Sequence, residues 1–157
     1  MKTRILLLSV LLVILASCGV KVSESYYDQP VKILRAEYDG SYVIRSSGKG
    51  RNAAAALAEA RKQAVYDVVF NGVPSTTSTV SSLKPLLLEV NAKTKYQDYF
   101  NSFFADGGEY LNYISIEDKR ATSSNWFRGE SQVTCQTNVT VNVAALKAKL
   151  QNDNILK

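Results

Sequence analysis

Apolar and polar side chains alternate most clearly over residues 132–143. The apolar positions are Val133, Cys135, Val139, Val141 and Val143, and the polar positions are Gln132, Thr134, Gln136, Asn138, Thr140 and Asn142. A period of two is typical of a strand with one face on the core and the other on water or a polar partner. The pattern therefore predicts a half-buried strand with Cys135 in the core.

Two earlier segments, Val31–Ala36 and Tyr42–Ser47, are rich in β-forming residues. The four residues between them end in Asp39-Gly40, which is typical of a hairpin turn. We expect Gly48-Lys49-Gly50 to break the second strand because glycine weakens strand interiors. A hairpin is therefore predicted at the start of the domain.

Helical spacing begins after this hairpin and predicts a helix over Ala53–Phe70, with Asn52 as its N-cap and Asn71-Gly72 as its stop. The apolar face of this helix comprises Ala53, Leu57, Ala60, Ala64 and Val68, and the opposite face comprises Glu59, Lys62, Gln63 and Tyr66. Because alanine dominates the apolar face, the helix can lie close to a sheet.

The rest of the chain contains two connections and four further elements. They are an irregular connection over residues 73–90, a helix over Ala92–Ala105 capped by Asn91, a strand over Tyr110–Asp118, a polar connection over Lys119–Phe127, the alternating strand, and a short helix over Ala144–Leu150. The order β-β-α-α-β-β-α predicts an α+β two-layer domain with a mainly antiparallel sheet and helices on one face. A doubly wound parallel sheet would need strands that are apolar on both faces.

The N-terminus has a targeting pattern. Lys2 and Arg4 precede an apolar run from Ile5 to Leu15, which is shorter than the roughly 20 residues of a membrane-spanning helix. The run ends in Leu15-Ala16-Ser17-Cys18, which resembles the lipobox of bacterial lipoproteins. That resemblance implies that Cys18 is acylated and becomes the first residue of the mature protein. The alternative is an ordinary signal peptide with Cys18 merely near the cleavage site.

The predicted organisation is a signal peptide over residues 1–17, a flexible tether over residues 18–29 and one domain over residues 30–157. Gly19 stands where the inner-membrane retention signal of enteric lipoproteins has Asp, and no acidic run follows the cysteine as in some surface-displayed Bacteroidetes lipoproteins. The resemblance therefore implies an anchor in the outer membrane that faces the periplasm, with surface display left open.

Composition limits the chemistry. The formal net charge is +5 and falls by two when Lys2 and Arg4 leave, so no nucleic-acid partner is indicated. The chain has no histidine, and Cys135 without one is a poor nucleophile. The acidic pairs Glu37/Asp39, Asp106/Glu109 and Glu117/Asp118 fall near turns or strand ends, where carboxylates are well solvated. We therefore predict no enzyme activity, no metal site and no cofactor.

One candidate binding site is the strand-to-helix turn Gly48, Lys49, Gly50 and Arg51. With Asn52 and Ala53 it matches a Gly-x-Gly-x-x-Ala dinucleotide fingerprint, but a hairpin precedes it and no parallel strand follows. A tight turn is the favoured interpretation. Weak anion binding stays open, because a helix N-terminus beside Lys49 and Arg51 attracts negative charge.

A second candidate is the polar face of the alternating strand, formed by Gln132, Thr134, Gln136, Asn138 and Thr140. Such a face either binds a polar partner or is simply solvated. The aromatic residues of the 96–113 region are expected to be mostly core, with Tyr99 or Phe104 as candidates for an exposed stacking patch.

Two segments resemble known envelope proteins. The Gly-x-Gly turn and alanine-spaced helix of residues 47–65 resemble the LPP20 lipoproteins and the N-terminal domain of the flagellar assembly protein FlgT. Residues 85–91 together with 99–104 resemble small uncharacterised lipoproteins of Bacteroidetes. The expected function is a non-enzymatic, lipid-anchored module that binds another envelope component, foremost a protein. The alternative is a glycan or small-ligand binder that uses the polar strand face and the loop Ser75–Ser82.

Overall fold

The computed structural model describes residues 31–115, 124–129 and 131–156. Over these residues the chain is α+β, with an antiparallel sheet of five strands, which confirms the predicted class. The strands are β1 (Lys32–Ala36), β2 (Ser41–Gly50), β3 (Ile114–Ser115), β4 (Asn125–Arg128) and β5 (Val133–Asn142). The path through the sheet is β1-β2-β5-β3, and β4 pairs with β5 beside β3.

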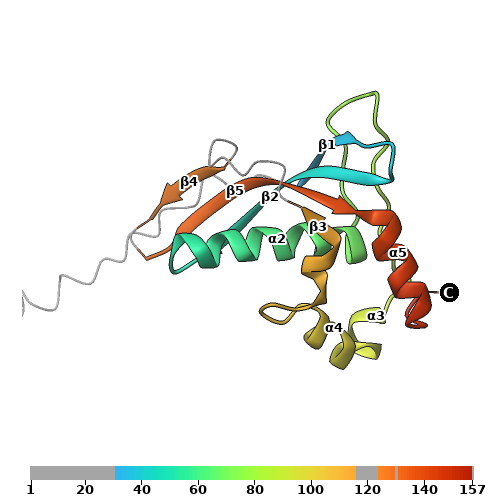
Figure 1. Cartoon of the computed structure of the whole chain (residues 1–157). Coiled ribbons are helices and arrows are strands. Elements are labelled where there is room, and N and C mark those ends of the chain that lie inside the picture. Colours follow the sequence, from blue (N-terminus) through green and yellow to red (C-terminus); the bar gives the residue numbers. More distant parts are fainter. Residues whose placement is uncertain (1–30, 116–123, 130, 157) are drawn as a thin grey trace, which may run out of the picture.

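The helices lie on one side of the sheet (Figure 1). They are α2 (Ala53–Phe70), α3 (Ala92–Lys95), α4 (Gln97–Phe103) and α5 (Val143–Asn152), with a 3-10 helix η1 (Glu109–Tyr113) between α4 and β3. Helix α2 runs beneath the sheet, and α3 and α4 lie beyond α2 on the side away from the strands (Figure 1). The core therefore extends from the sheet through α2 to α4.

The predicted hairpin is present, since β1 pairs with β2 and the Asp39 carboxylate accepts hydrogen bonds from the Ser41 backbone and hydroxyl at 2.9 and 3.0 Å. The expected strand break at Gly48-Lys49-Gly50 is wrong. Strand β2 continues to Gly50, because β5 pairs with every residue from Ser41 to Gly50. Ladder hydrogen bonds along that length offset the weak β-propensity of glycine.

Helix α2 begins and ends as predicted. The Asn52 side chain accepts a hydrogen bond from the Ala55 N–H at 2.9 Å, and Gly72 adopts a φ of +78° past the C-terminus. The predicted buried face is only partly right, since Ala53 is exposed and Leu57 half-buried. The residues that are buried are Ala56, Ala60, Ala64, Val65, Asp67, Val68 and Val69.

The two glycines of β2 explain which side of α2 faces the sheet. A Cβ on Gly48 would lie closer than 3.0 Å to the Ala60 nitrogen and the Ala56 oxygen, and a Cβ on Gly50 would meet the Ala56 nitrogen equally closely. The helix backbone thus occupies the space where strand side chains would stand. This close approach centres the contact on Ala56 and Ala60 rather than on Ala53 and Leu57.

The single helix predicted over Ala92–Ala105 is wrong, because the chain departs from helical geometry at Tyr96 (φ −112°, ψ 30°) and forms α3 and α4 separately. Aromatic residues lose side-chain freedom in a helix, so intrinsic propensity is low here and packing sets the path. Asn91 makes no side-chain capping bond, since its backbone (φ −107°, ψ 17°) lacks the extended conformation of an N-cap.

Two further expectations fail between α4 and β5. In the described part of the strand predicted over Tyr110–Asp118, residues 110–113 belong to η1 and residues 114–115 form β3, because Tyr110 is buried and its ring lies 5.9 Å from that of Phe104. The polar connection predicted over Lys119–Phe127 overlaps β4, which starts at Asn125 and pairs with residues 133–136 of β5. Residues 116–123 lie outside the described residues.

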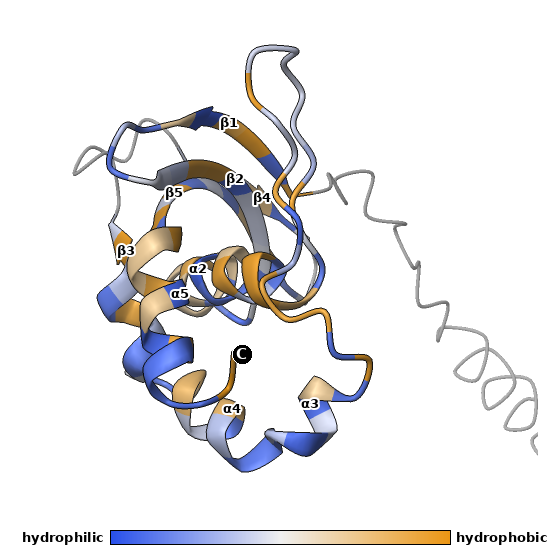
Figure 2. Ribbon diagram, turned by 90° about the vertical axis from the view of Figure 1, so that its right-hand side faces the viewer, coloured by the Kyte–Doolittle hydropathy of each residue, from blue (hydrophilic) through white to orange (hydrophobic). Residues whose placement is uncertain are grey.

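The connection over residues 73–90 is irregular, as predicted, yet fixed at its base. Val73 and Leu83 exchange two backbone hydrogen bonds of 2.8 and 2.9 Å, and Ile33 N–H donates to Pro74 at 2.9 Å. The closed loop projects beyond β1, away from α4 (Figure 2).

The C-terminal part agrees with the prediction. Strand β5 buries Cys135, Thr137, Val139 and Val141, and α5 buries Leu146 and Leu150.

Candidate functional site

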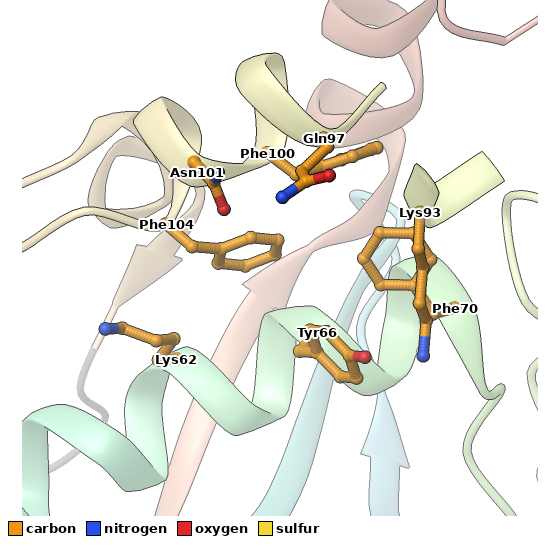
Figure 3. A pocket seen from close by; sticks show the side chains of 8 residues that line it. All are labelled: Lys62, Tyr66, Phe70, Lys93, Gln97, Phe100, Asn101 and Phe104. Carbon is orange, nitrogen blue, oxygen red and sulfur yellow. The ribbon is translucent and has the colours of Figure 1, made fainter. Parts of the chain in front are cut away.

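A groove lies between α2 and the α3–α4 region, on the side of α2 away from the sheet (Figure 3). Its volume is about 320 Å³. We call it the aromatic groove, and its lining residues are Lys62, Tyr66, Phe70, Lys93, Gln97, Phe100, Asn101 and Phe104. Lys62, Tyr66 and Phe70 are four residues apart along α2, so they share one helix face.

Aromatic rings form the floor of this groove. The Tyr66 ring centroid lies 4.8 Å from that of Phe70 and 5.9 Å from that of Phe104, and Phe70 meets Phe100 edge-on at 4.7 Å. The ammonium group of Lys93 lies 4.6 Å from the Tyr66 ring centroid and 5.0 Å from the Phe70 ring centroid. These cation–π contacts place a positive charge at one end of an apolar surface.

The rim of the groove is polar. Gln97 and Asn101 are exposed residues of α4, and their amide groups stand over the aromatic floor (Figure 3). Each amide has both donor and acceptor atoms. The groove can therefore stack a flat apolar group while its rim hydrogen-bonds a polar one.

A second hollow, of about 550 Å³, adjoins the groove at Lys62, which lines both. We call it the basic pocket. It is lined by Lys49, Gly50, Arg51, Ala54, Ala55, Ala58, Glu59, Arg61, Lys62, Asp106, Gly107, Tyr110 and Leu111. The end of β2, the first half of α2 and the 106–111 segment thus contribute four cations and two carboxylates.

Three of the four residues of the candidate anion-binding turn line this pocket. Lys49, Gly50 and Arg51 meet there, whereas Gly48 is buried beneath α2. The first turn of α2 contains no acidic residue, so its positive dipole end is not neutralised within the helix. Sequence reasoning missed Arg61 and Lys62, because the pocket exists only once the 106–111 segment folds back over α2.

The polar face of β5 lies elsewhere and lines neither hollow. Thr134, Gln136, Asn138 and Thr140 are half-buried along one strand face, whereas Gln132 precedes the strand. Asn138 accepts a 3.2 Å hydrogen bond from the Arg45 side chain, and Gln136 accepts one of 3.5 Å from Asn125. Part of the hydrogen-bonding capacity of this face is therefore used within the sheet.

Cys135 is a core residue. Its side chain is fully buried, and burial raises the pKa of its thiol to about 11. A thiol with so high a pKa is a poor nucleophile at neutral pH.

The other sequence candidates do not converge on a reactive centre. Glu37 pairs with Arg35 at 2.6 Å, and Asp39 binds Ser41. Within the described residues, no group of three or more His, Cys, Asp or Glu side chains is placed to hold a metal, and no helix is long and apolar enough to cross a membrane. Cys18 lies outside the described residues, so its acylation stays a prediction.

Sequence reasoning found only part of the aromatic groove: of its two candidates for a stacking patch, Phe104 lines the groove and Tyr99 does not. Phe100, Phe103 and Tyr110 are buried, as expected of a core cluster, but Phe104 and Tyr66 are half-buried and line the groove. The sequence signal that could have revealed the groove was Tyr66, an aromatic residue on a helix face otherwise assigned to water.

Comparisons with protein-family models, curated proteins and solved structures found no match for this chain. The resemblances stated above therefore stay predictions.

Proposed function

We propose that this chain is a lipid-anchored bacterial envelope protein that binds another envelope protein through the aromatic groove and catalyses no reaction. The observation that supports this proposal is the groove itself. Its half-buried rings and exposed amides combine an apolar floor with a polar rim, as at protein–protein contact sites. Aromatic anchors in a pocket are the commonest source of binding energy at such sites.

The anchor is supported by the order Leu15-Ala16-Ser17-Cys18 after an apolar run. Bacterial lipoproteins hold more than one acyl chain, and two chains give stable membrane attachment. The tether, residues 18–29, would span at most about 40 Å if extended. The domain would then reach a partner close to the membrane. The proposed location is the periplasmic side of the outer membrane.

The charge of the groove favours a partner with acidic residues. Lys62 and Lys93 line it, and no carboxylate of the described residues does. Opposite charges across an interface increase the association rate and suppress wrong partners. The segment that docks would therefore present an aromatic or large apolar side chain next to an acidic one.

Site-specific photocrosslinking of the acylated protein in its native envelope tests this proposal. A crosslinking residue at Asn101 faces the groove, whereas one at Ser102 is equally exposed on α4 and does not line it. We expect position 101, and not position 102, to give one stoichiometric protein adduct. Lys93→Ala should weaken that adduct. Equal capture from both positions, or unreacted monomer from both, would contradict the proposal.

Acylation is tested separately by metabolic labelling with a fatty acid. The wild type should incorporate label and Cys18→Ala should not. A labelled Cys18→Ala protein would exclude this anchor.

A glycan ligand is the second candidate, because Gln97 and Asn101 beside the Tyr66 and Phe104 rings also suit a stacked sugar. Envelope glycans would then raise the melting temperature in a thermal shift assay, since a ligand at 100 times its Kd adds about 2.7 kcal/mol to the free energy of unfolding. Asn101→Arg should abolish that shift and Ser102→Arg should not.

A further inference from the structure

We infer that the basic pocket is a binding site for a phosphate-bearing small molecule. This inference depends neither on the anchor nor on a partner in the aromatic groove. The pocket volume, about 550 Å³, is within the range of small-molecule sites and larger than a phosphate group needs. The pocket would therefore hold the phosphate and a further part of the ligand.

The charges that line the pocket are unbalanced. Lys49, Arg51, Arg61 and Lys62 face two carboxylates, Glu59 and Asp106. Only Lys62 has an ion pair there, 3.7 Å from the Asp106 carboxylate, and the Asp106 side chain is fully exposed. Within the described part of the chain, Lys49, Arg51 and Arg61 form no ion pair. Three of the cations that line the pocket are therefore not neutralised by a carboxylate of the described residues.

Arg61 is the most informative of these cations. Its Nε atom is buried and has no hydrogen-bond partner within the described residues. A buried donor without an acceptor costs free energy, because it has lost its water and gained nothing in return. A ligand oxygen does not reach this buried Nε atom in the present conformation, but Arg61 lines the pocket, and the terminal N–H groups of its guanidinium would bind a phosphate in a paired geometry.

The surrounding backbone favours the same ligand. Ala54, Ala55 and Ala58 line the pocket with short side chains, so a ligand can approach the first turns of α2 closely. The positive dipole end of α2 adds to the side-chain charges. Leu111, an exposed apolar residue that lines the pocket, offers an apolar surface for the remainder of the ligand.

The test is calorimetric titration of the acylated full chain in detergent with inorganic phosphate and pyrophosphate, with ionic strength fixed by sodium chloride. We expect saturable binding that is tighter for pyrophosphate. Arg61→Gln should weaken it at least tenfold and Lys49→Gln at least threefold. Lys147→Gln removes the same charge from an exposed position of α5 outside the pocket and should change Kd less than twofold.

Lys49 is exposed, so Lys49→Gln keeps the test valid even if Arg61→Gln does not fold. Citrate at the same ionic strength separates phosphate recognition from general anion attraction and should bind at least tenfold more weakly than pyrophosphate. The inference is overturned by absence of saturable binding, by equal losses in Lys49→Gln and Lys147→Gln, or by citrate binding as tightly as pyrophosphate.

Discussion

The Tyr99 hydroxyl of α4 donates a 2.6 Å hydrogen bond to the carboxylate of Asp153, the residue that follows α5. Asp153 also lies 3.2 Å from the Lys149 ammonium group, which in turn lies 2.9 Å from Glu109 of η1. The network joins the neighbouring elements α4 and η1 to the end of α5, which is distant from both in sequence. The pKa of Tyr99 is raised mainly by burial and secondly by its hydrogen bond to Asp153. The same hydrogen bond is the main cause of the lowered pKa of Asp153.

Tyr99→Phe should lower the free energy of unfolding by about 1–2 kcal/mol, because hydrogen bonds to ionised acceptors contribute more than neutral ones. Urea denaturation followed by circular dichroism measures this change. Tyr113→Phe is the matched control, since its hydroxyl has no hydrogen bond within the described residues and its ring is also half-buried. Equal losses in the two variants would show that the Tyr99–Asp153 bond contributes nothing.

The stability contribution of Asp153 should depend on pH. Its pKa in the folded chain is below the ordinary 3.8, so the unfolded chain binds the proton more readily. The contribution is therefore complete above about pH 5 and is lost as the pH falls below 4 through the lowered pKa. Urea titrations at pH 6, 4 and 3 should show wild type and Asp153→Asn converging as the pH falls.

Asp98→Asn controls for simple removal of a negative charge, because Asp98 is exposed on α4 and has no ion pair or hydrogen bond within the described residues. Its difference from wild type should stay small at each pH. A pH profile shared by Asp98→Asn and Asp153→Asn would contradict a specific role for Asp153.

Gly48→Ala should destabilise the fold by at least about 3 kcal/mol, because the added methyl group would overlap the backbone of Ala56 and Ala60 in α2. The clash is with backbone atoms, so a side-chain rotation cannot relieve it. Gly129→Ala is the matched control, since its Cβ would have one ordinary contact at 3.4 Å. Thermal or urea unfolding distinguishes the variants, and similar midpoints would disprove the close approach of α2 to β2.

The asparagines that precede α2 and α3 should differ in their effect on stability. Asn52 accepts a hydrogen bond from Ala55, so Asn52→Ala should cost about 1 kcal/mol. Asn91 makes no capping bond, and Asn91→Ala should change the free energy of unfolding by less than about 0.5 kcal/mol. Urea denaturation of both variants makes the comparison, and equal effects would contradict the capping geometry.

The sequence predicted those elements whose determinants are local. Asn52 and Gly72 bracket α2 within a single stretch of chain, and Asp39-Gly40 makes the β1–β2 turn without help from distant residues. The alternation of apolar and polar residues in β5 arises simply because one face of the strand lies against the core. Each of these patterns expresses a local backbone preference, which explains why the α+β class followed from them.

The elements that were mispredicted depend on distant contacts. Strand β4 has only four residues, which is too short to show a strand pattern in the sequence. It forms because it can pair with an edge of β5. Gly48 and Gly50 stay within β2 because their missing side chains admit α2, which a local propensity cannot express. The aromatic groove and the basic pocket likewise need residues 93–111 to fold back against α2. Sequence patterns therefore predicted Lys49 and Arg51 as candidates but not their partner Arg61.

Cys135 should be inert in the folded chain. Burial raises the pKa of its thiol from 9.0 to about 11, so at pH 8 it holds about a hundredfold less thiolate than an unfolded cysteine. In the Cys18→Ala protein Cys135 is the sole thiol, and its reaction with a thiol-specific disulfide reagent should be slower than in urea by at least that factor. Thr77→Cys in the same background adds an exposed thiol and should react at once under native conditions. If Cys135 reacted as fast as the introduced thiol, its face of β5 would not be packed in the core as described.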